Sequence, residues 1–291
     1  MEKLFNTPAE TAQSLIGVGK AKASLTSQNM ILLGILAGVY IALAAQLATI
    51  ATNDTGAFLG DGISRFLFGS TFTIGLMLVV IAGAELWTGN NLMVPALYAG
   101  EITTGELLKN WVLVYLANFA GSLLMVWLMN MTGLWSLNGG MVGVKALGIA
   151  VGKVQLSFSA AFARGILCNV LVTIAVMFAL SAKDITGKLV GMFFPIMAFV
   201  TSGFEHSIAN MYFVPAGIIL KNQAAIVELF GKDISMLTWG NFISNNLIPV
   251  TLGNFVGGAL IVATSYYLIY VKPTIAKKAA ADAGQASVAG K

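Results

Sequence analysis

The chain has 291 residues, of which 57% are hydrophobic and only 10% are charged, and its mean hydropathy is +0.85. A soluble domain carries about 25% charged residues, so this composition predicts an integral membrane protein. The net charge of +4 is not gathered into a basic cluster with aromatic residues, which argues against nucleic acid as a partner. One cysteine, Cys168, and one histidine, His206, give no metal-ligand cluster, so we expect neither a metal nor another cofactor.

Residues 1–28 have mixed polarity and are predicted to form a cytoplasmic segment outside the membrane domain. Thr7, Pro8 and Glu10 have the order of a helix cap, a first helical residue and a capping-box partner. The apolar and basic residues that follow indicate a short amphipathic helix. We expect no cleavable signal peptide, because these residues include no short apolar core followed by a cleavage site.

Apolar segments long enough to cross a bilayer of about 30 Å as helices follow in chain order. They are predicted at 29–52, 65–87, 110–131, 157–181, 189–220 and 241–271. Six spans place both termini on one side, and most of the lysines and arginines mark that side as cytoplasmic. Residues 272–291, rich in Ala, Lys and Gly, are predicted to be a disordered cytoplasmic tail. The fold class is therefore all-α, with a single membrane domain over 29–271.

The two halves of the membrane domain resemble each other. The segment NWVLVYLANFAGSLLMV from Asn110 aligns with NLIPVTLGNFVGGALIV from Asn246, 136 residues later. The second and fifth spans align at an offset of 120, and the first and fourth align more weakly at 131. Each half holds three spans, so the second half must enter the membrane from the opposite side. This inverted repeat is typical of transporters and channels whose site lies near the midplane.

Each half is predicted to break one helix at an equivalent place. The second span breaks at WTGNN, Trp87–Asn91, and the fifth breaks at TSGFEHSIAN, Thr201–Asn210. Non-helical backbone at membrane depth needs protein or a water-filled cavity to satisfy it, and half-helix ends favour anions. Two pairs are predicted to hold the broken backbone, the carboxylates as acceptors for its N–H groups: Glu85 with Glu205, and Asn90 with Asn210.

His206 lies inside the second break, whereas its twin in the first half is Leu86. An ionisable group within a membrane is costly and usually marks a pathway, although a neutral hydrogen-bonded imidazole without a transport role is the alternative. Thr88 is either a local cap or a hydroxyl that faces the pore. Lys153 either snorkels to the interface or attracts anions. Asn169, in the fourth span, makes either a helix contact or part of the site.

Bulky apolar side chains close to the breaks either pack in the core or form constrictions that exclude water and hydrated ions. They are Phe72, Leu76, Leu86 and Phe199. An enzyme is not expected, because the chain has a single histidine, no Gly-rich phosphate loop and no soluble domain. A water or neutral-solute channel, which also uses paired broken helices, and a non-transporting membrane scaffold are the alternatives of another class.

The strings GFEHSIANMYFVP, GAELWTGNNL and ISNNLIPVTLGNFVGG closely resemble the signatures of the formate–nitrite transporter family, and the resemblance spans about residues 5 to 271. It implies an aquaporin-like homopentamer in the bacterial inner membrane with one pore per protomer. It also implies passive or proton-coupled passage of small monovalent anions: formate, nitrite, hydrosulfide, acetate and lactate. Formate is preferred here, with nitrite or hydrosulfide as alternatives within the family.

The resemblance also implies roles for single residues. His206 would be the central pore histidine and Thr88 the threonine that faces it. Lys153 would raise the anion density near the site, and Asn169 would lie close by. The constrictions would be formed by Phe72, Leu76, Leu86 and Phe199. The N-terminal helix resembles the segment proposed to gate some members at low pH.

Overall fold

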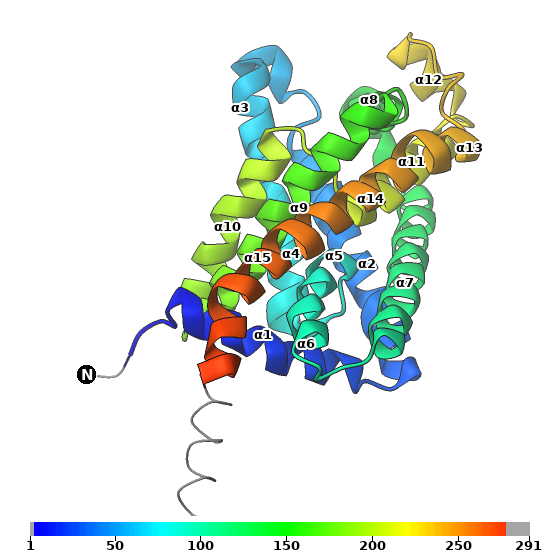
Figure 1. Cartoon of the computed structure of the whole chain (residues 1–291). Coiled ribbons are helices and arrows are strands. Elements are labelled where there is room, and N and C mark those ends of the chain that lie inside the picture. Colours follow the sequence, from blue (N-terminus) through cyan, green and yellow to red (C-terminus); the bar gives the residue numbers. More distant parts are fainter. Residues whose placement is uncertain (1–2, 278–291) are drawn as a thin grey trace, which may run out of the picture.

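The structure is a computed structural model, which describes residues 3–277, and this part of the chain is nearly all helical (Figure 1). The α-helices are α1 Pro8–Ala23, α2 Ser27–Ala51, α3 Thr55–Phe72, α4 Ile74–Met77, α5 Trp87–Asn90, α6 Val94–Tyr98, α7 Thr104–Met131, α8 Met141–Val154, α9 Phe158–Ser181, α10 Ile185–Thr201, α11 Ser207–Leu220, α12 Ala224–Phe230, α13 Trp239–Asn241, α14 Ile248–Phe255 and α15 Thr264–Tyr266. Wider π-helical turns continue some of them at Leu78–Gly83, Phe242–Leu247, Val256–Ala263 and Tyr267–Val271. Short 3₁₀ turns lie at Asn91–Met93, Leu134–Ser136 and Asn138–Gly140. The first and last described segments leave the bundle at the same end (Figure 1).

Long apolar helices make up most of the bundle. Those long and apolar enough to cross a bilayer without interruption are Ser27–Ala51, Thr55–Gly83, Thr104–Met131, Phe158–Ser181 and Trp239–Lys277. The predicted fifth span is two shorter helices, α10 and α11, of 17 and 14 residues. Many large apolar side chains face outward, among them Leu47 on α2 and Trp127 on α7, which are 43% and 55% exposed. Such a surface suits contact with lipid or with other subunits rather than with water.

The first predicted break, Trp87–Asn91, is misplaced, whereas the second, Thr201–Asn210, contains the observed break but extends too far into the next helix. Trp87–Asn90 and Ser207–Asn210 are helical, and the extended backbone lies just before each of them. The helix of the second span ends at Gly83 and that of the fifth at Thr201, with Gly83 and Gly203 at φ of 84° and 77°. Glycine reaches this left-handed region without steric cost, so the two glycines end the helices. The polar residues that follow start new helices instead of forming the break.

Other boundaries also differ from the prediction. The second span starts at Thr55 rather than 65, with a kink at Gly60, whose φ is 77°. Two helices that the sequence reading did not predict, α8 and α12, lie between spans. The disordered tail predicted at 272–291 lies mostly outside the described residues, and 272–277 are helical.

The first helix belongs to the repeat. The capping box of Thr7 and Glu10 with Pro8 at the first position is confirmed, and Leu15 is fully buried against the bundle. At the offset of 131 that relates the first and fourth spans, α1 corresponds to α8, and Lys22 near the end of α1 corresponds to Lys153 in α8. Each half therefore consists of a short helix followed by three predicted spans.

Polar contacts strap the N-terminal segment to distant parts of the bundle. The Asn6 backbone N–H donates to the carbonyl of Ser181 at 2.8 Å, and the Ser181 hydroxyl donates to the Asn6 carbonyl at 2.7 Å. The side-chain amide of Gln13 donates to the Tyr270 carbonyl at 3.2 Å. The start of α1 is therefore fixed to the end of α9 and to the last span.

Glycines bring the first and third spans of each half into close contact. A Cβ atom on Gly121 of α7 would lie 2.1 Å from the carbonyl oxygen of Ile35 on α2. A Cβ atom on Gly257 would lie 2.2 Å from the carbonyl oxygen of Ile166 on α9. Small residues allow such close crossings in membrane helices. These crossings carry Asn118 and Asn254, one helical turn earlier, to the two breaks.

Candidate functional site

In the first half, the broken backbone is held by the side-chain amide of Asn118. Its Nδ2 donates to the carbonyl oxygens of Gly34 at 2.8 Å and Glu85 at 2.9 Å. Its Oδ1 accepts the backbone N–H of Trp87, the first residue of α5, at 3.0 Å. Asn118 is fully buried, so its amide replaces the water that would otherwise satisfy these groups.

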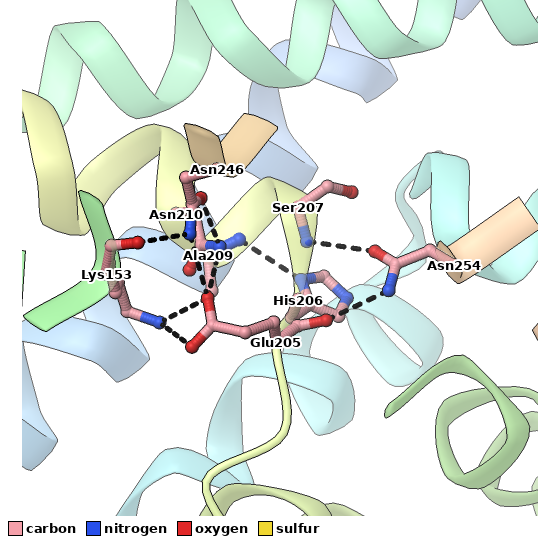
Figure 2. A network of polar contacts seen from close by, with 8 residues as sticks. All are labelled: Lys153, Glu205, His206, Ser207, Ala209, Asn210, Asn246 and Asn254. Carbon is pink, nitrogen blue, oxygen red and sulfur yellow. Dashed lines mark hydrogen bonds and ion pairs between the residues drawn. The ribbon is translucent and has the colours of Figure 1, made fainter. Parts of the chain in front are cut away.

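In the second half, Asn254 makes the equivalent three contacts, and Figure 2 shows those with Glu205 and Ser207. Its Nδ2 donates to the carbonyl oxygens of Gly165 at 2.8 Å and Glu205 at 2.9 Å. Its Oδ1 accepts the N–H of Ser207, the first residue of α11, at 2.9 Å. The sequence reading paired Asn118 with Asn254 in the repeat but gave them no role, and that pairing is the signal that would have found them.

The acceptor role predicted for the carboxylates is wrong. Glu85 pairs with the ammonium of Lys22 at 2.6 Å, and Glu205 pairs with that of Lys153 at 3.0 Å through both oxygens. A buried carboxylate carries a full charge, which a lysine neutralises and a backbone N–H does not. A neutral amide suits the break better, because it offers both a donor and an acceptor.

A chain of asparagines joins each ion pair to the third span of its half. Asn90 donates to Glu85 at 2.7 Å and to Asn110 at 2.8 Å. In the other half the same two contacts, both 2.7 Å, run from Asn210 to Glu205 and to Asn246 (Figure 2). The amides of Asn110 and Asn246 then donate to the carbonyls of Lys22 and Lys153 at 3.3 and 3.1 Å.

The symmetry ends at His206. Its Nδ1 accepts the backbone N–H of Ala209 at 3.1 Å and so caps α11, as Figure 2 shows. Its Nε2 lies 2.9 Å from the hydroxyl oxygen of Thr88, and its ring stacks on Phe199 at a centroid distance of 6.0 Å. Because Nδ1 is an acceptor, the neutral ring carries its proton on Nε2 and donates to Thr88. The twin residue Leu86 makes no side-chain cap.

A cavity of about 260 Å³, here called the α8 cavity, leads to one side of His206. Positive charge gathers in its lining, from Arg65, Lys145 and Lys153, against Asp61 and Glu205. Lys145 is partly buried, which lowers the pKa of its ammonium, although Asp61 acts in the opposite direction. Lys153 holds its ammonium inside this cavity, on Glu205 and 5.4 Å from the ring centroid of Phe213, so it does not snorkel outward.

A second cavity of about 570 Å³, here called the α1 cavity, lies at the other break and includes Lys22 and Glu85 in its lining. The predicted constriction residues divide between the two cavities. Phe72 and Phe199 line the α8 cavity beside His206, with their rings 6.1 Å apart and edge to face. Leu76 and Leu86 line the α1 cavity. All four side chains are buried.

Thr88 and Asn169 line neither cavity and are completely buried. The Asn169 amide donates to the Thr88 carbonyl at 3.3 Å and to the Asn254 carbonyl at 2.7 Å. Asn169 is therefore a helix contact and a neighbour of the site at once. Lys22 is a further residue that the sequence reading missed, and the offset of 131 from Lys153 would have revealed it.

Comparison with known proteins gives the same picture over almost the entire chain. The family model described as formate/nitrite transporter matches residues 9–268. A probable formate transporter of Methanothermobacter thermautotrophicus is 39% identical over 94% of this chain and all of its own length. The formate channel FocA of Escherichia coli K12 is also 39% identical, over 91% of this chain and 94% of its own.

Solved structures are similar in the same way. A pentameric formate channel with formate bound has a TM-score of 0.76 and 38% identity, covering 84% of this chain and 98% of that one. An ion channel of the same family has a TM-score of 0.76 and 27% identity, covering 89% and 98%. The matched region contains both breaks, both ion pairs and the Thr88–His206 contact. This chain belongs to the formate/nitrite transporter family.

Proposed function

We propose that the protein passes small monovalent anions, chiefly formate, across a membrane through a pore in each protomer. The observation that carries this proposal is the hydrogen bond between His206 and Thr88 at the inner end of the α8 cavity. The single titratable side chain of the breaks that lacks an ionic partner thus sits beside a constriction of Phe72 and Phe199. The names of relatives that are 39% identical support formate as the substrate.

The charges of the α8 cavity favour entry of an anion. Arg65 and Lys153 are paired with Asp61 and Glu205, so the lining keeps one net positive charge, from Lys145, which favours an anion over a cation. A bare carboxylate would cross the apolar constriction only at great cost, because burial without a partner strips its hydration. The anion therefore needs hydrogen bonds or a proton at this point.

His206 and Thr88 supply a directed donor. The Nε2–H group donates to the Thr88 oxygen, which leaves the Thr88 hydroxyl hydrogen free to point to an anion. Formate that gains a proton from water in the cavity becomes neutral formic acid and passes the apolar side chains more easily. Flux is then expected to rise as the pH falls, since more of the substrate can be protonated.

The oligomeric state and the membrane location of the protein are further parts of the proposal. The pentameric neighbour, which is 38% identical, supports a homopentamer. The distribution of lysine and arginine supports cytoplasmic termini, and a multi-pass bacterial inner-membrane protein is the location we propose. Residues 1–28 and the membrane domain 29–271 would act as one unit. The function requires no catalytic chemistry, metal or cofactor, and the described residues include no cluster of metal-ligating side chains.

The test is flux into proteoliposomes that contain the purified full-length protein. Formate, nitrite, hydrosulfide, acetate, lactate and glycerol are compared from pH 5 to 8. Formate uptake that exceeds glycerol uptake and falls in His206→Phe supports the proposal. Faster glycerol than formate would indicate a neutral-solute channel, and absence of any flux would indicate a scaffold. If His206→Phe kept the full pH dependence, the histidine would have no part in proton supply.

A further inference from the structure

Behind Thr88, away from both cavities, three positions depart from the repeat. Asn91 follows α5, Asn169 lies on α9, and Gly258 lies in the π-helical segment Val256–Ala263. At the offsets of 120, 131 and 136, their twins are Met211, Gly38 and Ser122. The contacts of Asn118 and Asn254 at the two breaks are repeated, so this difference nearby calls for a separate cause.

The two asparagines hold consecutive carbonyls of the turn that carries Thr88. Asn91 donates from Nδ2 to the Trp87 carbonyl at 3.0 Å. Asn169 donates from Nδ2 to the Thr88 carbonyl at 3.3 Å and to the Asn254 carbonyl at 2.7 Å. Met211 and Gly38, at the twin positions, have no polar side chain. The turn opposite His206 is therefore fixed by amides that the other turn lacks.

Gly258 makes room for both asparagines. A Cβ atom at Gly258 would lie 2.2 Å from Nδ2 of Asn169 and 3.0 Å from Cβ of Asn91. Asn169 could yield only by leaving the carbonyls to which it donates. A side chain at Gly258 therefore competes with the contact to Thr88, since its nearest neighbours are side-chain atoms of Asn169 and Asn91.

The equivalent crossing in the first half has the opposite order of sizes. There the small residue is Gly38 on the first span, whose Cβ atom would lie 2.1 Å from the carbonyl oxygen of Asn118. The third span carries Ser122, which has a Cβ atom of its own. A close crossing of the first and third spans can therefore be made with the glycine on either of the two helices. Only the arrangement of the second half brings an amide to Thr88.

The arrangement has an energetic cost that packing does not explain. The Oδ1 atoms of Asn91 and Asn169 are buried and accept no hydrogen bond from any group in residues 3–277. An unpartnered buried acceptor is unfavourable, and an apolar residue of similar size would avoid it. The two asparagines therefore contribute through their N–H groups, which donate to the Trp87 and Thr88 carbonyls.

We propose that Gly258, Asn91 and Asn169 are positioning residues that hold the Thr88 hydroxyl at Nε2 of His206. The inference rests on the proposed function, because it is in anion passage that the position of this hydroxyl matters. On this proposal, Gly258 in the last span determines how precisely the Thr88 hydroxyl is placed, and with it the selectivity of the pore for a small anion. Loss of this placement lowers formate flux and relaxes discrimination against larger anions such as lactate.

The test compares Gly258→Ala, Asn169→Ala and the double variant as intact, purified assemblies. Formate and lactate fluxes are measured in proteoliposomes, with Ser122→Ala as the matched control. We expect formate flux to fall about fivefold in Gly258→Ala, as for loss of one hydrogen bond, and the lactate-to-formate ratio to rise. The double variant should lose no more than Asn169→Ala alone. Ser122→Ala removes a hydroxyl without a partner in the described chain and should behave as wild type.

A second readout does not depend on transport. His206 is the only histidine, so ¹⁵N-histidine labelling gives one imidazole whose Nε2 resonance reports the bond to Thr88. That resonance should shift in Gly258→Ala and in Asn169→Ala but not in Ser122→Ala. An unchanged resonance in Gly258→Ala, or losses that add in the double variant, would overturn the inference. A shifted resonance in a protein whose wild type carries no formate would support the positioning and contradict the proposed function.

Discussion

The two helix breaks share a frame but differ in what the frame carries. Asn118 and Asn254 make the same three contacts at distances that agree within 0.1 Å. Both breaks add a lysine–glutamate pair. Only the second places a histidine at the helix start, where the first has Leu86. The comparison shows that the contacts that satisfy a broken helix are duplicated, whereas the residue proposed to handle the anion occurs in one half only.

The ion pairs differ in degree rather than in kind. The side chains of Lys153 and Glu205 are 14% and 6% exposed, whereas those of Lys22 and Glu85 are 23% and 8% exposed. If the lysine of either pair is removed, the remaining carboxylate is therefore less accessible to water at Glu205 than at Glu85. The frame is symmetric in contacts and unequal in burial.

Asn118→Ala and Asn254→Ala should have the largest effects. Each removes an amide that satisfies two carbonyls and one N–H, and unsatisfied buried groups cost about 1–3 kcal/mol each. We expect neither variant to yield a stable assembly, as judged by size-exclusion chromatography and thermal unfolding. If one variant were as stable as wild type and the other not, the two breaks would not share their frame.

Lys153→Met should come next, with a loss of about 3–5 kcal/mol of stability, because Glu205 would remain buried without its partner. Lys22→Met should cost less, since its pair is more exposed. The double variant Lys153→Met/Glu205→Gln should regain stability but not anion uptake. A double variant that takes up formate at the wild-type rate would show that Lys153 acts on the scaffold alone.

Moving the histidine to the other break tests the unequal part of the comparison. His206→Leu should lower formate flux about tenfold, because the Nε2–H donor and its contact with the Thr88 hydroxyl are both lost. Adding Leu86→His should not restore it, because the residue equivalent to Thr88 is Ile208, which has no hydroxyl. Flux is measured at pH 6, and recovery in the swapped variant would mean that the breaks are interchangeable.

Thr88→Val keeps the shape of the side chain and removes the hydroxyl that faces His206. We expect about a fivefold loss of formate flux, the value of one hydrogen bond, and a loss of about 1–3 kcal/mol of stability, because the buried Nε2–H of His206 loses its acceptor. Thr88→Ser serves as the control that retains the hydroxyl and should stay close to wild type. Equal fluxes in Thr88→Val and wild type would remove Thr88 from the anion path.

The smallest effect concerns the start of α1. The hydrogen bond from Lys3, together with those from Thr7, lowers the pKa of Glu10 from 4.5 to about 2. A lowered pKa means that this contribution is present above pH 4.5 and is lost as the pH falls through about 2. Glu10→Gln should therefore leave the pH dependence of flux between 5 and 8 unchanged. A shifted pH profile in Glu10→Gln would make the capping box an acid-sensitive element.

Much of this architecture could be predicted from the sequence, because the repeat itself carries the information. The matched NF-x-G segments placed Asn118 opposite Asn254, and the lone His206 indicated the asymmetric site. The partners of the amides could not be predicted, since they depend on how closely α2 and α7 approach. The distance between α2 and α7 is set by glycines such as Gly121, and the sequence does not reveal that Gly121 faces the carbonyl of Ile35.

The first break was misplaced and the second was predicted too long, because polar residues were taken as the places where the helices end. Glycines end the helices, and the polar residues Thr88 and Asn210 lie within the first turn of the next helix. The helix α8 was missed because its 14 residues are too few to cross a bilayer, so the segment was taken as a loop between two spans. Lys153 was predicted either to snorkel to the interface or to attract anions, and its ion pair with Glu205 was not predicted because the two residues are far apart in sequence.

The strapping of α1 has a consequence for the order of events during synthesis. Asn6 bonds to Ser181, and Gln13 bonds to Tyr270, close to the last described residue. The first helix to leave the ribosome therefore cannot complete its docking until the last span has been inserted. Lys22 reaches Glu85 within the first half, but the remaining anchors come late. The docking of α1 would act as a completeness check, so that a chain truncated before its last span keeps a loose N-terminal helix.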